Sequence, residues 1–65
     1  DYLPTLRAWL EAQGDPTEAG NRLGVHENTV RYRLKRIQDV TGYSPSDPRE
    51  AYVLRLAITL GRLRS

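Results

Sequence analysis

Residues 24–36 read GVHENTVRYRLKR, and they predict a turn followed by a helix with two different sides. A glycine turn leads into a segment with helical spacing, which has one apolar side and one cationic side. Four of the chain's ten Lys and Arg residues lie within positions 31–36, and no acidic residue lies between Asn28 and Gln38. This pattern is typical of a helix that lies in a DNA groove, because one side holds the fold while the other meets phosphates and base edges.

The composition fits one small domain and excludes several kinds of chemistry. The 65 residues include no cysteine, which excludes disulfides and thiolate metal sites. The lone histidine, His26, cannot form a zinc site without several carboxylate partners. We therefore expect neither a metal nor another cofactor. One histidine without cysteine also leaves too few groups for a catalytic site, so the sequence predicts that the chain is not an enzyme.

The charge pattern favours a polyanionic partner more than the total charge does. The net charge is +2 and the pI is near 9.4, so it is the local clustering of cations that matters. No apolar run approaches the ~20 residues of a membrane span, and no signal peptide is visible. Because the chain begins at Asp1 and contains no Met, we expect a fragment of a longer cytoplasmic, nucleoid-associated protein without membrane contact. The alternative is a complete small protein whose Met was removed.

Glycine and proline divide the chain into helical segments. The sequence predicts an all-α fold, a small bundle of four main helices in one domain over residues 1–65, because no window shows strand-like alternation bounded by turns. Two of the starts carry Asp-Pro, in which Asp serves as N-cap and Pro fits the first helical position. The four helices are expected at residues 2–13, from Asp15-Pro16 to about Leu23, at about 27–41, and from Asp47-Pro48 to about Leu63.

The third predicted helix has two distinct sides. The spacing i, i+4, i+7, i+11 forms a buried stripe of Val30, Leu34, Ile37 and Thr41. At about 100° per residue, the opposite side carries Asn28, Arg31, Tyr32, Lys35 and Arg36. Arg33 lies at the edge of the stripe, where its stem can cover the core or its guanidinium can pair with Glu18 or Asp39.

The last predicted helix has more apolar surface than one small core needs. One stripe consists of Val53, Leu56, Ala57 and Leu60, and a second stripe beside it consists of Leu54 and Ile58. We expect the second stripe to contact another copy of the chain or an upstream domain, since an amphipathic helix with two apolar stripes has one to spare.

The segment around Gly24 meets the requirements of a helix-turn-helix. The support helix needs a small residue where the two helices touch, and Ala19 or Gly20 supplies it. The turn needs a residue that tolerates positive φ, which Gly24 provides. Apolar side chains must then wedge the helices together, and the candidates are Leu23, Val25, Val30 and Leu34.

The string HENTVRYRLKRI at residues 26–37, the later Thr41-Gly42 pair and Asp47-Pro48 before an Ala- and Leu-rich helix resemble the C-terminal DNA-binding domain of the PucR/CdaR family of bacterial transcription regulators. The resemblance covers essentially the whole chain. It implies a helix-turn-helix at the C-terminal end of a longer regulator, upstream domains that sense a small molecule, and dimeric or higher-order binding to double-stranded DNA. The chain departs from the usual pattern at Gly20, where helix-turn-helix motifs carry Ala, at a cost to the helix of ~1 kcal/mol.

The resemblance also implies roles for single residues. The N-terminal part of the recognition helix is expected to read bases, with Asn28 pairing to adenine and Arg31 to guanine. Glu27 either accepts from cytosine or favours the helix N-terminus electrostatically. The expected base-reading residues are His26, Glu27, Asn28, Arg31 and Tyr32, and the expected phosphate contacts are Thr17, Thr29, Lys35 and Arg36.

Several alternatives stay open. His26 can instead be a turn residue or helix cap, and Tyr32 can pack against the first helix. The whole domain can be a protein-interaction or oligomerisation module built on a helix-turn-helix scaffold, because fold does not fix function. RNA binding is disfavoured, since Tyr32 is the only aromatic residue in the basic stretch and RNA-binding modules stack bases on several.

Overall fold

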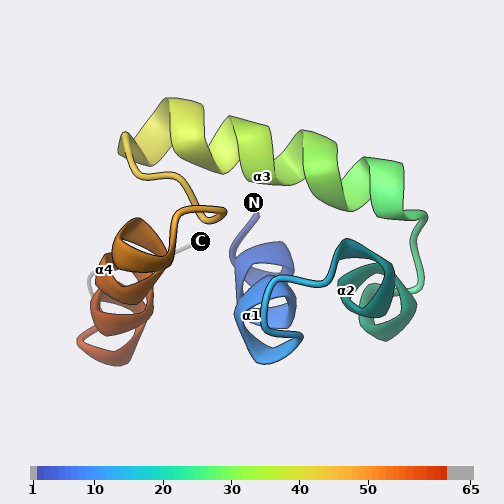
Figure 1. Ribbon diagram of the computed structural model, residues 1–65, viewed down its shortest axis with the longest axis horizontal. Coiled ribbons are helices and arrows are strands. Elements are labelled where there is room, and N and C mark those ends of the chain that lie inside the picture. Colours follow the sequence, from blue (N-terminus) through green and yellow to red (C-terminus); the bar gives the residue numbers. More distant parts are fainter. Residues whose placement is uncertain (1, 62–65) are drawn as a thin grey trace.

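The computed structural model describes residues 2–61, and within that range all regular structure is helical. The four helices are α1 (Leu3–Glu11), α2 (Pro16–Leu23), α3 (Glu27–Thr41) and α4 (Pro48–Thr59). The predicted all-α, four-helix fold is therefore confirmed. Figure 1 shows α3 running across one side of the molecule, with α4, α1 and α2 arranged beneath it. None of the described helices is long and apolar enough to cross a membrane.

Both Asp-Pro starts are helix caps, as the sequence predicts. The Asp15 carboxylate accepts from the backbone N–H groups of Thr17 (2.9 Å) and Glu18 (3.3 Å). The Asp47 carboxylate does the same for α4, accepting from the N–H groups of Arg49 (2.8 Å) and Glu50 (3.3 Å). Each cap satisfies two backbone donors that the first turn of a helix leaves without partners.

One apolar core joins all four helices. The stripe predicted for α3 is buried at Val30, Leu34 and Ile37, whereas Thr41 at its end is half-buried. The Thr41 hydroxyl donates to the Ile37 carbonyl at 2.8 Å, which satisfies it within the helix. The buried apolar residues are Leu6, Ala8, Trp9, Leu10, Ala19, Val30, Leu34, Ile37 and Leu54.

The apolar stripes of α4 are the reverse of those expected. Leu54 is 1% exposed and belongs to the core, and Ile58 is partly buried against it. The expectation that Leu54 and Ile58 face a partner is therefore wrong for this domain. Leu56, expected inside, is 43% exposed, and Leu60 is 69% exposed.

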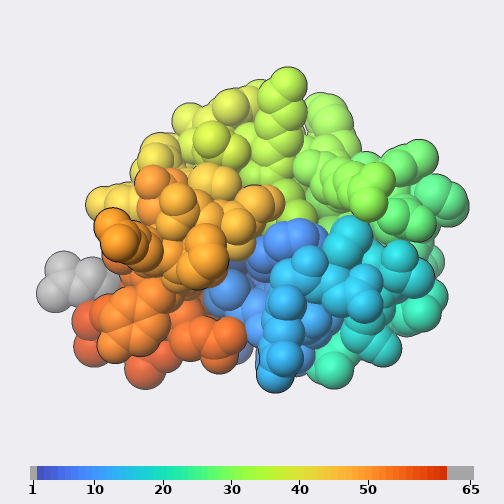
Figure 2. Space-filling model, viewed as in Figure 1, coloured from blue at the N-terminus to red at the C-terminus, as the bar shows by residue number. Residues whose placement is uncertain are grey.

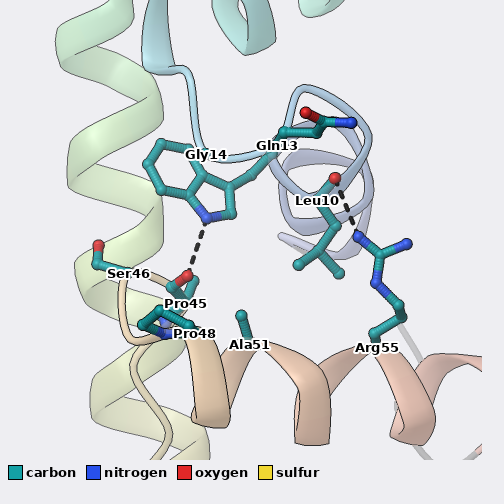
Figure 3. Close-up of a pocket in the computed structure, with 9 residues that line it drawn as sticks. Leu10, Gln13, Gly14, Pro45, Ser46, Pro48, Ala51 and Arg55 are labelled. Carbon is teal, nitrogen blue, oxygen red and sulfur yellow. Dashed lines mark hydrogen bonds between the residues drawn. The ribbon is translucent and has the colours of Figure 1, made fainter.

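Two hydrogen bonds to α1 fix which side of α4 faces inward (Figure 3). Nη2 of Arg55 donates to the Leu10 carbonyl at 3.1 Å. The Trp9 indole N–H donates to the Pro45 carbonyl at 3.0 Å and so ties the loop before α4 to the core. Because both stripes are apolar, these polar contacts and the shape of the loop select the Leu54 side. Their partners lie far apart in sequence, which is why helical spacing did not reveal the choice.

The last helix is also shorter than predicted. It ends at Thr59, with Leu60 as its cap, and Gly61 follows in the left-handed conformation with a φ of 70°. The expected end near Leu63 lies outside the described residues.

Arg33 joins α3 to α1 by a contact that the sequence did not suggest. Its Nη1 donates to the Thr5 hydroxyl at 3.3 Å, in place of the expected ion pair with Glu18 or Asp39. Thr5 is 1% exposed, so the bond satisfies a buried hydroxyl. Arg33 therefore serves the fold and is not part of the exposed cationic side.

Replacing Leu54 by Ala should lower the free energy of unfolding by about 2–5 kcal/mol, because it opens a cavity in the core. The matched change Leu56→Ala, one half-turn away, should cost less than about 1 kcal/mol. Urea unfolding followed by circular dichroism measures both. A larger loss for Leu56→Ala than for Leu54→Ala would show that α4 packs on the other side.

Candidate DNA-binding surface

A very close approach of backbone to backbone sets the angle between α2 and α3. A Cβ built on Gly20 would lie 2.6 Å from the Val25 carbonyl oxygen and 3.4 Å from the Glu27 nitrogen. The Gly20 carbonyl in turn accepts from the Val25 N–H at 3.0 Å. Gly20 therefore provides the space that this turn needs, at a position where helix-turn-helix motifs usually carry Ala.

The turn itself depends on Gly24, as predicted. Gly24 caps α2 with φ 73° and ψ 30°, the left-handed region that favours glycine. Its N–H donates to the Asn21 carbonyl at 3.4 Å, and the chain then enters α3 after only Val25 and His26. Leu23 and Val25 pack against the core beside the turn and wedge the two helices together.

His26 is the N-cap of α3. Its Nδ1 accepts from the Asn28 N–H at 3.0 Å, so the ring must carry its lone pair on that nitrogen. The capping role that the sequence left open is therefore what the structure shows. His26 is exposed, so its second ring nitrogen can still reach a ligand.

The outward side of α3 is polar and exposed along its length. Asn28, Arg31, Tyr32, Lys35 and Arg36 are all exposed, as their spacing predicts. Tyr32 is 61% exposed, which rules out the alternative that it packs against α1. Glu27 and Thr29, at the edges of this side, are half-buried.

The three outward cations of α3 differ in their ion pairs. Nη2 of Arg31 lies 3.1 Å from Oε2 of Glu27, and Nη1 of Arg36 lies 3.9 Å from Oδ2 of Asp39. Lys35 forms no ion pair within the described part of the chain. Exposed pairs of this kind are worth about 0–1 kcal/mol, so both arginines can turn to a ligand at little cost. Among residues 2–61, no acidic side chain offsets the charge of Lys35, unlike those of Arg31 and Arg36.

The start of α2 offers fewer groups for contact with a DNA phosphate than the sequence suggested. Thr17 is exposed, but the Asp15 carboxylate already accepts from its N–H and from that of Glu18. A phosphate at this end would meet the negative charge of Asp15. Only the Thr17 hydroxyl therefore remains as a candidate contact.

A groove beside α3 brings further residues to the same surface. It has a volume of about 270 Å³ and separates the outward side of α3 from the loop before α4. Figure 2 shows this loop (orange) bordering α3 (green to yellow) on the visible face. Gln38 and Ser46 lie on its rim with Arg31 and Lys35. The i+3 spacing of Gln38 from Lys35 could have predicted that both lie on this surface. Ser46 reaches the groove only through the tertiary fold, so the sequence could not have predicted it.

Comparison with known proteins shows that the sequence matches a family of helix-turn-helix domains. The PucR C-terminal helix-turn-helix domain family matches residues 2–60. The chain is 54% identical over 61 residues to an uncharacterised protein of Mycobacterium tuberculosis (strain H37Rv), covering 94% of the chain and 15% of that protein. It is 43% identical over 63 residues to the purine catabolism regulatory protein of Bacillus subtilis (strain 168), covering 97% of the chain and 12% of the relative. The chain thus spans about one seventh of the length of the first relative and one eighth of the second.

A solved structure has the same fold. The crystal structure of a regulator of polyketide synthase expression from Bifidobacterium adolescentis superposes with a TM-score of 0.85 at 45% sequence identity. The match covers 89% of this chain and 24% of that chain.

Replacing Gly20 by Ala should destabilise the domain by about 1–3 kcal/mol, because the added Cβ forces the turn apart. Gly24→Ala is the matched control, since a Cβ there has open space and strains only the backbone dihedrals, at about 1–2 kcal/mol. Gly24→Asn should recover part of that loss because Asn tolerates the left-handed region. Thermal unfolding measures all three. A Gly20→Ala variant that gained the ~1 kcal/mol of helix propensity would contradict the tight contact.

Proposed function

The chain belongs to the PucR C-terminal helix-turn-helix domain family of transcription regulators, and on this premise we propose that it binds double-stranded DNA sequence-specifically, with α3 in the major groove. One observation carries the proposal. The outward side of α3 exposes Asn28 and Tyr32 between cations on both flanks, with Arg31 and Lys35 on one and Arg36 on the other. Recognition in a DNA groove requires polar side chains that hydrogen-bond to base edges, flanked by cationic side chains that contact phosphates.

The base-reading set divides into direct and supporting roles. Asn28 can pair bidentately with adenine and Arg31 with guanine, while Tyr32 reaches a thymine methyl or a phosphate. Glu27 holds the Arg31 guanidinium at 3.1 Å, so we assign it to positioning Arg31 more than to reading cytosine. His26 fixes the start of α3 through its Nδ1 and has its other ring nitrogen for DNA.

The phosphate set surrounds these readers. Lys35 has no acidic partner in the part of the chain that the structure describes, and it should make the strongest non-specific contact. Arg36 shares its charge with Asp39 at 3.9 Å, a pair long enough to open easily. Thr29 and Thr17 offer hydroxyl groups at the two helix starts, and hydroxyl contacts to phosphate position the domain without reading sequence.

The outer face of α4 supports a second role. This face consists of Tyr52, Val53, Leu56 and Leu60, all exposed. We propose that it pairs two copies of the domain, as expected for a regulator that binds two half-sites as a dimer. In the longer proteins of the family an upstream effector-sensing domain can bias this pairing, in a cytoplasmic protein bound to the nucleoid. A pure interaction module is the competing function that the same face favours.

Replacing Arg31 by Ala should weaken binding by roughly 1–3 kcal/mol and relax specificity at one base position. Lys35→Ala should weaken binding to all duplexes alike and reduce the salt slope by about 1. Fluorescence anisotropy at several salt concentrations, on a duplex selected from random DNA, measures both effects. Arg7→Ala, an exposed cation on α1, is the matched control and should leave binding unchanged.

If neither the Arg31 nor the Lys35 variant differs from the Arg7 control, α3 is not the docking side. If the unmodified chain shows no binding to random duplex at low salt, the interaction module is the better account.

Introducing Val53→Glu together with Leu56→Glu should keep the domain folded, because both side chains are at least 40% exposed. It should shift the chain toward monomer in sedimentation equilibrium, since buried carboxylates oppose pairing. The control, Arg7→Glu, adds a carboxylate at an exposed position of α1 and leaves α4 unchanged. An unchanged mass for the double variant, or a monomeric parent chain at high concentration, would rule out this face.

A further inference from the structure

The groove between α3 and the loop before α4 has a chemical character of its own. Its floor is apolar and buried, formed by Trp9, Leu34 and Pro45. Its rim is polar and comes from both walls, with Arg31, Lys35 and Gln38 from α3 and Ser46 from the loop. The rim therefore carries two cations and two neutral hydrogen-bonding groups, and no acidic side chain lines it.

The net charge of the rim favours an anion. Glu27, outside the groove, offsets Arg31 through the 3.1 Å pair, whereas Lys35 has no acidic partner within the described residues. An anion seated between Lys35 and the loop would meet a full positive charge on one side. On the other side it would meet the Ser46 hydroxyl, which has no hydrogen-bond partner among residues 2–61. The Ser46 N–H donates to Oγ of Ser44 at 3.3 Å.

The loop wall is fixed before any ligand arrives. The Trp9 indole holds the Pro45 carbonyl at 3.0 Å in a buried bond. The Glu50 carboxylate accepts from the Ser44 N–H, and the Ser44 carbonyl accepts from the Asp47 N–H at 3.2 Å. A wall held from three sides loses little conformational entropy on binding, so a single hydroxyl on it can contribute measurably to affinity.

The position of the groove identifies the anion. Arg31, Lys35 and Gln38 share one flank of α3, next to the side that carries Asn28 and Tyr32. The proposed function requires that the side with Asn28 and Tyr32 enters the major groove of DNA. The neighbouring flank of α3 then faces the sugar-phosphate chain at the edge of the major groove. Lysine, glutamine and serine side chains are common phosphate contacts.

We propose that this groove binds one backbone phosphate of the DNA, held by Lys35 and Gln38 from α3 and by Ser46 from the loop before α4. The inference rests on the proposed function and extends it, because it adds a second segment of the chain to the interface. A phosphate bound by both α3 and the loop fixes the position of α3 along the major groove of DNA. A phosphate contact from α3 alone would restrict that position less.

The test replaces Ser46 by Ala, which removes the hydroxyl and keeps the backbone N–H that donates to Oγ of Ser44. Binding to the selected duplex should weaken roughly ten- to a hundredfold, the loss of one hydrogen bond to a charged group. The salt slope should stay unchanged because no cation is lost. Gln38→Ala should behave alike, and Thr59→Ala, which removes a hydroxyl far from the groove, should bind like the parent.

Neutral methylphosphonate groups placed singly along the duplex then locate the phosphate. One position should weaken the parent chain but have little further effect on the Ser46→Ala and Lys35→Gln variants, because they have lost the same contact. Two results would overturn the inference. One is a Ser46→Ala variant that binds the duplex as tightly as the parent chain. The other is that the methylphosphonate position whose effect is lost in Ser46→Ala differs from the position whose effect is lost in Lys35→Gln. In that case intact sequence preference in the parent chain would leave the proposed function standing, whereas loss of all duplex binding would remove both.

Discussion

The structure depends on the contact between the backbone at Gly20 and the carbonyl of Val25. No side chain fits there, since a Cβ on Gly20 would lie 2.6 Å from that oxygen. The contact brings α2 against the turn, and Gly24 in the left-handed region then turns the chain into α3. From this turn, α3 runs with its buried stripe in one core with residues of α1. The exposed side of α3 follows from the same turn, so the geometry of the proposed reading surface begins at one glycine.

The apolar core and the exposed polar side of α3 are coupled through a few long side chains. Arg33 satisfies the buried hydroxyl of Thr5, and Arg55 and Trp9 tie α4 and its loop to α1. In so small a domain such bonds determine how the last helix is oriented, because apolar burial alone does not distinguish its two stripes. They also place the loop before α4 beside α3. The same hydrogen bonds therefore stabilise both the fold and the candidate interface.

Local features of the sequence predicted most of the fold. The Asp15 and Asp47 caps, the Gly24 turn and the Val30 stripe each depend on residues within a few positions of one another, and all are confirmed. The assignment of Leu54 and Ile58 to a partner surface was wrong because periodicity cannot choose between two apolar stripes on one helix. The exposed side of α3 was predictable from spacing, and the structure settled two open points there by showing His26 as a cap and Tyr32 as exposed. The placement of Ser46 beside Lys35 depends on tertiary contacts and was beyond the sequence. Which of these residues touch bases and which touch phosphates stays a prediction.

Amide chemical-shift mapping of the chain on a duplex selected from random DNA can show whether α3 meets the DNA, since it reports every backbone N–H at once. We expect large shifts at residues 26–36, further shifts at 44–47, and small ones over 53–59. Shifts confined to α4, with α3 unperturbed at saturating duplex, would contradict the claim that α3 reads DNA.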